Sequence, residues 1–238
     1  MVEQINTKNI LKKIKTEKLL YIFFISIGIG QVNIGSWDAL TCPLDIRDIV
    51  QVGDNTYCAT GGGLMLYNNG ISEVYTTVDG LYKVDILSIS NDIYNNIWLG
   101  GKSPSGFVQI YNIDQGNIDI FDYGLTEITE FWISDSIAFA SFVDGQDLGL
   151  IKWVYLDGRW SYRDIYRNFP IELGSINGLK VMKNSVFLAT NNGLFTAYIS
   201  SNLKDPNNWS IAFNDVNGLI NTLCEVDSGI AFNQNNSA

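Results

Sequence analysis

Short runs in which apolar and polar side chains alternate fill the chain after residue 30. Residues 46–52 and 84–89 are examples, and Gly, Asn and Asp separate such runs from the next. Alternation with a period of two, bounded by turn-forming residues, is typical of half-buried β-strands. After residue 30 the sequence shows no sustained 3.6-residue apolar period bounded by helix caps. The pattern therefore predicts an all-β fold.

The predicted strands recur as a repeat. Five β-rich runs end at Thr60, Gly100, Ser141, Thr190 and Asn233, which are 40, 41, 49 and 43 positions apart. Further strands follow the first four runs, at 61–67, 71–75, 106–111, 118–121, 149–155, 160–163, 191–198 and 209–213. Four short strands in about 40 residues are typical of a β-propeller blade. We predict a partial β-propeller of about four to five four-stranded blades, from a probable total of about seven.

Three aromatic residues of the repeat, Trp98, Phe139 and Phe187, are predicted to pack between neighbouring blades. Trp37 precedes the first inner strand much as Trp209 precedes the run 221–226, which suggests that the N-terminal segment is an outermost strand.

The fifth unit stops two strands short, so we expect the sequence to be a piece of a longer protein. Apolar flanks exposed by such a piece, including the strands from 220 to 233, would favour self-association.

The first thirty residues have the organisation of a secretory signal peptide. Residues 1–18 carry five lysines and two acids, and residues 19–30 are uncharged and mostly apolar. A helix of twelve residues is about 18 Å long, which is less than the roughly 30 Å hydrocarbon core. We therefore predict a signal peptide at 1–30, a propeller domain at 31–238 and no transmembrane span after the signal peptide. An uncleaved anchor or a buried helix is the alternative.

Composition excludes several classes of function. The chain has no histidine, which rules out Ser-His-Asp and Cys-His catalysis and His-ligated zinc. Its 15 basic and 25 acidic side chains give a formal charge of −10, and without residues 1–30 the 10 basic and 23 acidic side chains give −13. This balance disfavours nucleic acid, which requires clustered cations.

The three cysteines, Cys42, Cys58 and Cys224, leave two interpretations open. Export would permit a Cys42–Cys58 disulfide, whereas the odd number and the apolar run around Cys58 favour buried free thiols. Because no C-x-x-C pair is present, the sequence predicts neither a metal site nor a redox site at these residues.

Several short motifs resemble catalytic, metal-binding or ligand-binding patterns. Residues 90–98 resemble the Asp-box turn of sialidases, with Tyr94 in place of glycine. Residues 144–147 predict a hairpin turn rather than a calcium loop, and 68–70 and 191–193 predict type I′ turns. The basic group alternates with aromatic residues and predicts a solvated outer strand; its members are Arg159, Arg163 and Arg167. No catalytic, cofactor-binding or metal-binding residue is predicted, and ligand-binding residues remain unassigned.

The second unit resembles two-component-regulator propeller repeats. The residues that carry this resemblance are Gly80, Leu81, Ile86, Ile89, Asp92, Asn96, Ile97, Trp98, Leu99, Gly100 and Tyr111. The first unit is more similar to the N-terminal propeller of PorZ-like proteins of the type IX secretion system, through Trp37, Tyr57, Cys58, Ala59, Thr60, Gly63, Leu64, Tyr67, Gly80 and Leu81. The resemblance covers residues 35–238 and is weakest at 171–173, where the Gly-Leu linker is missing.

This resemblance implies a non-catalytic, exported propeller that serves as a binding or assembly module of the cell envelope, with an association with type IX secretion. The alternative is the periplasmic ligand-sensing propeller of a two-component hybrid histidine kinase, and an exported propeller enzyme is a third class. The expected partners are proteins or surface glycans, and no cofactor is expected. The expected location is the periplasm or cell surface of a Gram-negative bacterium.

Overall fold

The computed structural model describes residues 42–170, 173–216, 218–227 and 229–235. The chain divides into two units, residues 1–38 and 39–238, and all described residues belong to the second. The predicted signal peptide and the Trp37 strand lie outside the described residues. None of the helices in the described ranges has the length and apolar character that a membrane crossing requires.

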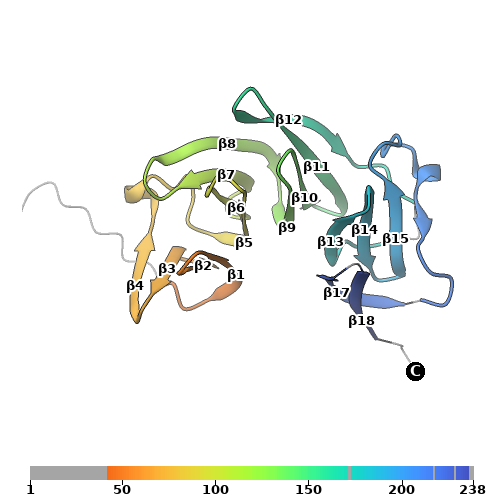
Figure 1. Ribbon diagram of the computed structural model, residues 1–238, viewed down its shortest axis with the longest axis horizontal. Coiled ribbons are helices and arrows are strands. Elements are labelled where there is room, and N and C mark those ends of the chain that lie inside the picture. The colour runs from red at the N-terminus through yellow and green to blue at the C-terminus, as the bar shows by residue number, and fades with distance from the viewer. Residues whose placement is uncertain (1–41, 171–172, 217, 228, 236–238) are drawn as a thin grey trace, which may run out of the picture. The chain divides into compact units, whose positions relative to one another are not determined.

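Antiparallel sheets follow one another in chain order (Figure 1). The first sheet contains β1 (Ile46–Val52), β2 (Asn55–Thr60), β3 (Gly63–Asn68) and β4 (Ile71–Tyr75), and the second contains β5 (Ile86–Asn91), β6 (Ile97–Gly101), β7 (Gly106–Asn112) and β8 (Gly116–Leu125). The third contains β9 (Glu127–Ile133), β10 (Ile137–Asp144), β11 (Asp147–Leu156) and β12 (Arg159–Tyr166), and the fourth contains β13 (Gly178–Met182), β14 (Ser185–Thr190), β15 (Gly193–Tyr198) and β16 (Ser210–Ile211). A fifth sheet of two strands contains β17 (Leu219–Val226) and β18 (Gly229–Asn235). The short helices η1 (Thr77–Asp79) and η3 (Pro206–Asn208) lie in connections.

The first strands of successive sheets contact one another, in the order β1, β5, β9, β13 and β17. Each sheet therefore packs face to face against the next, with its first strand innermost. The described sheets do not close into a ring. This arrangement confirms the predicted all-β, partial propeller.

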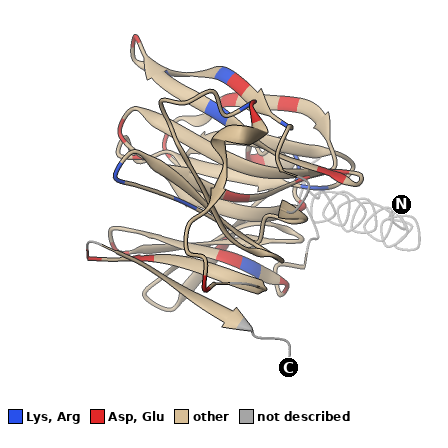
Figure 2. Cartoon of the chain, turned by 90° about the vertical axis from the view of Figure 1, so that its right-hand side faces the viewer, with Lys and Arg blue, Asp and Glu red and all other residues tan. Residues whose placement is uncertain are grey.

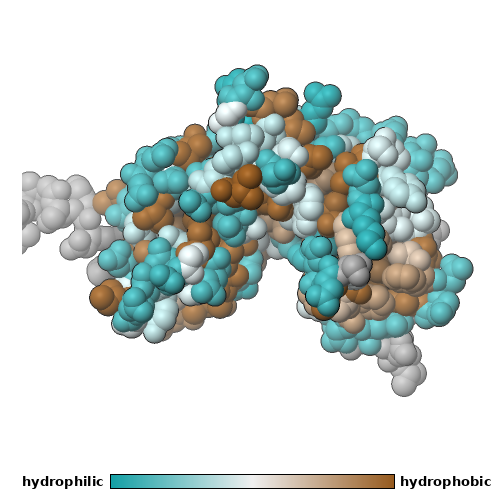
Figure 3. All heavy atoms as spheres, viewed as in Figure 1, coloured by the Kyte–Doolittle hydropathy of each residue, from teal (hydrophilic) through white to brown (hydrophobic). Residues whose placement is uncertain are grey.

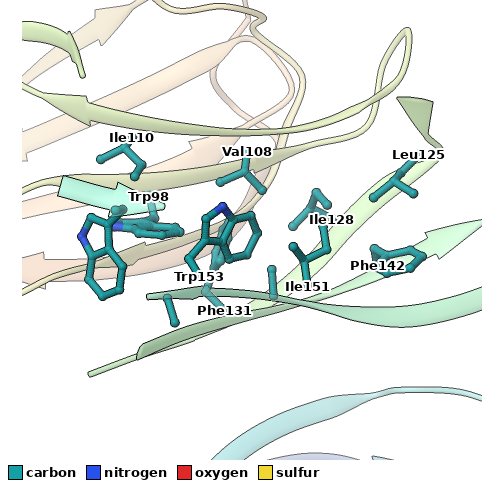
Figure 4. Packing of buried hydrophobic residues seen from close by; sticks show 12 residues of the cluster. Trp98, Val108, Ile110, Leu125, Ile128, Phe131, Phe142, Ile151 and Trp153 are labelled. Carbon is teal, nitrogen blue, oxygen red and sulfur yellow. The ribbon is translucent and has the colours of Figure 1, made fainter. Parts of the chain in front are cut away.

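Four hydrophobic clusters fill the spaces between consecutive sheets. Trp98 from β6 is fully buried between the second and third sheets, where it meets Phe131 and Trp153 in edge-to-face contacts (Figure 4). Phe139 is fully buried between the third and fourth sheets, and Phe187 packs between the fourth and fifth. The prediction that these aromatic residues separate neighbouring blades is confirmed.

The hairpins between the second and third strands of the first and fourth sheets share one turn. Thr60 Oγ1 accepts a hydrogen bond from the Gly62 N–H at 3.1 Å and donates one to the Gly63 carbonyl at 2.7 Å. Thr190 forms the same two bonds with Asn192 and Gly193, at 3.0 and 2.8 Å. In this turn only the glycine that starts the third strand has a positive φ, 132° and 119° respectively. The type I′ prediction for 191–193 was therefore wrong, because the threonine side chain fixes a different turn.

The type I′ prediction for 68–70 is confirmed, since Asn69 and Gly70 have φ values of 49° and 85° between β3 and β4. Two other predicted features differ. The strand predicted at 118–121 is longer and covers 116–125, because it continues to Leu125, which is buried in the cluster between the second and third sheets. The strand predicted at 209–213 shortens to Ser210–Ile211, because η3 and buried Trp209 occupy the approach to it.

The flanks of the terminal sheets differ in polarity. In the first sheet, Ile49, Cys58, Met65 and Val74 lie in register on the side opposite the residues that pack on the second sheet. In the fifth sheet, Ile220, Leu223, Ile230 and Phe232 pack towards the fourth, and the opposite side carries Thr222, Cys224, Ala231 and Asn233. The expectation of an apolar free flank in both terminal sheets thus holds for the first sheet and was wrong for the fifth.

Candidate functional site

The five innermost strands together line a pocket of about 690 Å³. Its lining consists of residues 47–50, 87, 89, 90, 129–131, 177, 178, 180, 222 and 223, and we call it the inner pocket. All five sheets contribute to it, so its geometry depends on how the sheets are held against one another. It is the candidate functional site.

Two side chains of β1 connect the first sheet to the second. The Arg47 guanidinium pairs with the Asp85 carboxylate and donates a hydrogen bond to the Ile86 carbonyl at 3.1 Å. The bond to Asp85 raises the pKa of Arg47. Asp48 accepts a hydrogen bond from the Ile89 N–H at 2.9 Å. Each of these two side chains of β1 therefore bonds to a backbone group of the next inner strand.

The next two junctions follow the same principle. Ser88 Oγ donates to the Ile128 carbonyl at 3.1 Å and joins the second sheet to the third. Glu130 accepts from the Leu179 N–H at 2.7 Å and forms an ion pair with Lys180 at 2.8 Å, joining the third sheet to the fourth. Burial raises the pKa of the Glu130 carboxyl, and the nearby Asp48 carboxylate adds to this rise, while Lys180 opposes it.

The last junction is made by an amide. Asn177 Nδ2 donates to the Ile220 carbonyl at 2.9 Å and joins the fourth sheet to the fifth. The bonded residues at the four junctions are 38 to 50 positions apart, which is about one repeat of the sequence. Both acids in the lining and both basic side chains already serve these contacts. The charged groups of the lining therefore hold the sheets together, and the other side chains of the lining are apolar or carry neutral polar groups.

The sequence did not reveal this set of contacts. Each junction uses a polar residue within an inner strand or just before it, but the acceptor or donor that this residue meets is usually a backbone group in another repeat. A backbone partner leaves no side-chain pattern at a fixed spacing. The only available signal was the recurrence of polar residues at one-repeat intervals, at Asp48, Ser88, Glu130 and Asn177.

The motif at 90–98 forms a structural turn between β5 and β6. Asp92 is 2% exposed, and its carboxylate accepts hydrogen bonds from the Tyr94 and Asn96 N–H groups at 2.9 and 3.0 Å. It also accepts from the indole N–H groups of Trp98 at 3.3 Å and Trp160 at 2.8 Å. Because Trp160 belongs to the third sheet, this carboxylate joins two sheets.

The basic group of the outer strand does not converge on one site. Arg159 and Arg163 are exposed on β12, as predicted, and Arg167 forms an ion pair with Asp144 at 2.8 Å. Asp144 and Asp147 face each other at the β10–β11 hairpin, so the turn prediction is confirmed. Figure 2 shows acidic and basic positions spread over several strands and turns rather than gathered in one patch.

All three cysteines carry free thiols. Cys42 and Cys224 are exposed, and Cys58 is buried within β2. Burial raises the pKa of the Cys58 thiol, which keeps it in the unreactive protonated form at neutral pH. Of the two interpretations, the structure supports free thiols.

No known family profile matches the chain, and no curated protein matches it in sequence. Solved structures do match its fold. One is the extracellular domain described as that of the hybrid two-component system BT3049 from B. thetaiotaomicron, with 16% identity and a TM-score of 0.58 over 85% of this chain and 29% of that one. The corresponding domain of BT4673 gives 18% identity and a TM-score of 0.55 over 85% and 28%.

A third match is PorZ, described as an essential surface component of the type IX secretion system of Porphyromonas gingivalis. It shares 16% identity and a TM-score of 0.53, over 76% of this chain and 30% of that chain. The chain thus spans under a third of the length of these three structures. At these identities the likeness concerns the fold, and it bears out the resemblance to two-component-regulator and PorZ-like propellers.

Proposed function

We propose that this protein is an exported propeller module that binds or assembles with other components of the cell envelope. The observation that carries the proposal is the inner pocket, in which each sheet is fixed to the next by polar contacts. Such a scaffold holds surface turns and a concave wall in fixed positions, which is the requirement for recognition. The charged groups of the pocket hold sheets together, and this use favours binding over catalysis.

The compartment is part of the proposal. Residues 1–30 direct export, are removed near residue 30, and leave the propeller domain 31–238 in the periplasm or at the cell surface. The extracellular origin of the BT3049 and BT4673 domains and the surface location of PorZ support this. Mass spectrometry of the exported protein should find a mature N-terminus close to residue 31. A mature form that keeps Met1 or Lys18 would contradict it.

An association with type IX secretion is the finer form of the proposal, with envelope proteins or surface glycans as partners. Ligand sensing for a two-component system is the second candidate, and the likeness of the fold to the extracellular domains of BT3049 and BT4673 supports it. The two candidate functions predict different defects when the protein is absent: impaired protein secretion in one case and an impaired transcriptional response in the other.

Deletion of the gene from the source bacterium separates them. A secretion role predicts that exported cargo proteins accumulate in the periplasm, while transcription of nutrient-responsive genes is unchanged. A sensing role predicts normal secretion and a lost transcriptional response to one nutrient. Complementation with the wild-type gene controls for polar effects. Normal secretion together with normal transcription would contradict both candidates.

A further inference from the structure

A second pocket lies between the first and second sheets, and we call it the turn pocket. Its volume is about 500 Å³, and its lining lies in and beside the turns β1–β2, β3–β4, β5–β6 and β7–β8. It shares no described residue with the inner pocket. Figure 3 shows hydrophilic side chains interspersed with apolar ones over these two sheets, at its left. Polar groups are therefore available for recognition in this part of the molecule.

The asparagine side chains of the turn pocket largely hold its own walls together. Asn68 Nδ2 donates a hydrogen bond to Asn55 Oδ1, and Asn55 Nδ2 donates one to the Tyr57 hydroxyl at 3.3 Å. In the second sheet, Asn112 Oδ1 accepts a hydrogen bond from the Asp114 N–H at 3.0 Å. These bonds fix the turns to the ends of the strands, so most of the amide groups are already in use.

The groups of the turn pocket that lack a partner are a buried acceptor and two carboxylates. Asn68 Oδ1 is buried and receives no hydrogen bond from any described residue. The exposed carboxylates of Asp54 and Asp114 form no ion pair within the described ranges, and the described lining contains no Lys or Arg. A buried acceptor without a donor is unfavourable. The pocket therefore suits a positively charged ligand that brings several hydrogen-bond donors.

The size of the turn pocket favours an organic cation over a metal ion. A calcium ion is held by oxygen atoms at about 2.3–2.6 Å, so its site is much smaller than this pocket. Among the described residues, no group of three or more acidic or cysteine side chains could hold a metal ion. A guanidinium group is planar, carries five N–H donors and no acceptor, and pairs well with carboxylates.

The next junction shows how this fold fills the equivalent space. Between the second and third sheets, the indole N–H of Trp160 in β12 donates to Asp92 in the β5–β6 turn at 2.8 Å. Beside it, Tyr94 stacks on Tyr155 with ring centroids 4.1 Å apart. The corresponding outer strand of the second sheet, β8, contains no tryptophan. An arginine side chain from outside would bring the same kind of planar N–H donor to the β1–β2 turn.

We propose that the turn pocket is a docking site for an arginine side chain presented by a partner protein. The guanidinium pairs with the carboxylates of Asp54 and Asp114, and an N–H group directed into the pocket supplies the donor that Asn68 Oδ1 lacks. The formal charge of −10 on the chain attracts a basic partner over a longer distance. This inference rests on the proposed binding function and specifies the chemistry of a partner, at a site separate from the inner pocket.

The probe is N-acetyl-arginine methylamide, and its control is the citrulline analogue, which has a similar shape without the charge. In NMR titrations of the isotope-labelled full chain, the arginine probe should shift the backbone amide signals of residues 53–55 and 112–114 until they saturate. The citrulline analogue should bind at least about fivefold more weakly, because it lacks the charge-assisted bonds. Added salt should weaken binding of the arginine probe, because the carboxylates are exposed.

Variants of the protein test the two carboxylates. Asp54→Asn combined with Asp114→Asn keeps the shape of the pocket and should weaken binding of the arginine probe at least about tenfold. Asp135→Asn combined with Asp157→Asn removes two exposed carboxylates from turns of the third sheet and should leave binding unchanged. Thermal unfolding checks that both double variants fold.

Three results would overturn the proposal: equal binding of the citrulline analogue, equal weakening in both double variants, or calcium ions that shift the same amide signals at lower concentrations than the arginine probe. The experiment uses the purified chain. Its failure would therefore leave the proposed function standing, because the gene deletion tests that function separately.

Discussion

Asp92 shows how much structure one carboxylate can organise in this fold. It closes the β5–β6 turn through two backbone N–H groups and receives indole N–H groups from two sheets. The role of Asp92 in the turn was predictable, because the sequence at 90–98 resembles the Asp-box pattern. The bond from Trp160 was not, since that residue is 68 positions away and belongs to another repeat.

Replacing Asp92 should strongly destabilise the protein. Asp92→Ala leaves two buried indole N–H groups without an acceptor, and we expect the free energy of unfolding to fall by about 3 kcal/mol. Urea unfolding followed by tryptophan fluorescence measures this. Asp135→Ala, an exposed aspartate in the β9–β10 turn, should change stability by less than about 0.5 kcal/mol. Equal effects of the two substitutions would refute the structural role of Asp92.

A second prediction at this scale concerns Gly193. Its φ of 119° and the nearby Val216 carbonyl leave no room for a side chain. We expect Gly193→Ala to lower the free energy of unfolding by at least about 2 kcal/mol. Gly145→Ala is the matched control, because Gly145 has a φ of 66° with open space around its Cβ position, and should cost about 1 kcal/mol. A smaller loss at 193 than at 145 would argue against the close approach.

At the scale of the element, β1 and β4 begin and end where the alternating pattern does, at 46–52 and 71–75. Such strands are predictable because alternate side chains, such as Val50 and Val52 of β1, pack against the core cluster, and the pattern indicates this directly. The inner pocket was not predictable, since its contacts depend on how far each sheet is shifted relative to the next. The β16 strand was predicted too long because the loop before it, with η3 and Trp209, determines where pairing starts.

The junction between β9 and β13 has a testable pH dependence. Burial raises the pKa of Glu130 in the folded state above its ordinary value of 4.5, so the folded protein holds this proton more tightly than the unfolded chain. The contribution of Glu130 to stability therefore falls as the pH rises from about 4.5 through the raised pKa.

Glu130→Gln keeps the acceptor for the Leu179 N–H and removes the titration. We expect the wild type to lose stability relative to this variant as the pH rises above about 4.5, in denaturant unfolding measured at several pH values. Against the opposing effect of burial, hydrogen bonds and nearby cationic side chains lower the pKa values of the Asp122 and Asp164 carboxyls in the folded state. Both groups titrate in both proteins, so their effects cancel in the comparison. A difference that grows in favour of the wild type with rising pH would show that the Lys180 ion pair outweighs burial.

At the scale of the whole molecule, we expect the apolar flank of the first sheet to mediate self-association. Ile49 is 57% exposed, in line with Cys58, Met65 and Val74. Ile49→Glu should lower the average mass measured by light scattering at high protein concentration, because it places a charge in this row. Ile93→Glu, at a 64% exposed turn position, serves as the control. Equal association of both variants would locate the contact elsewhere.

The spacing of the contacts between inner strands also bears on the export that we propose for this protein. An exported polypeptide emerges from the translocation pore in order from its N-terminus. Because each junction joins residues 38 to 50 positions apart, a sheet can be fixed to its predecessor as soon as one more repeat has emerged. Each fastened sheet is too wide to slide back through the pore. Folding of each successive repeat, at intervals of about forty residues, would therefore prevent backward movement of the chain and give translocation its direction.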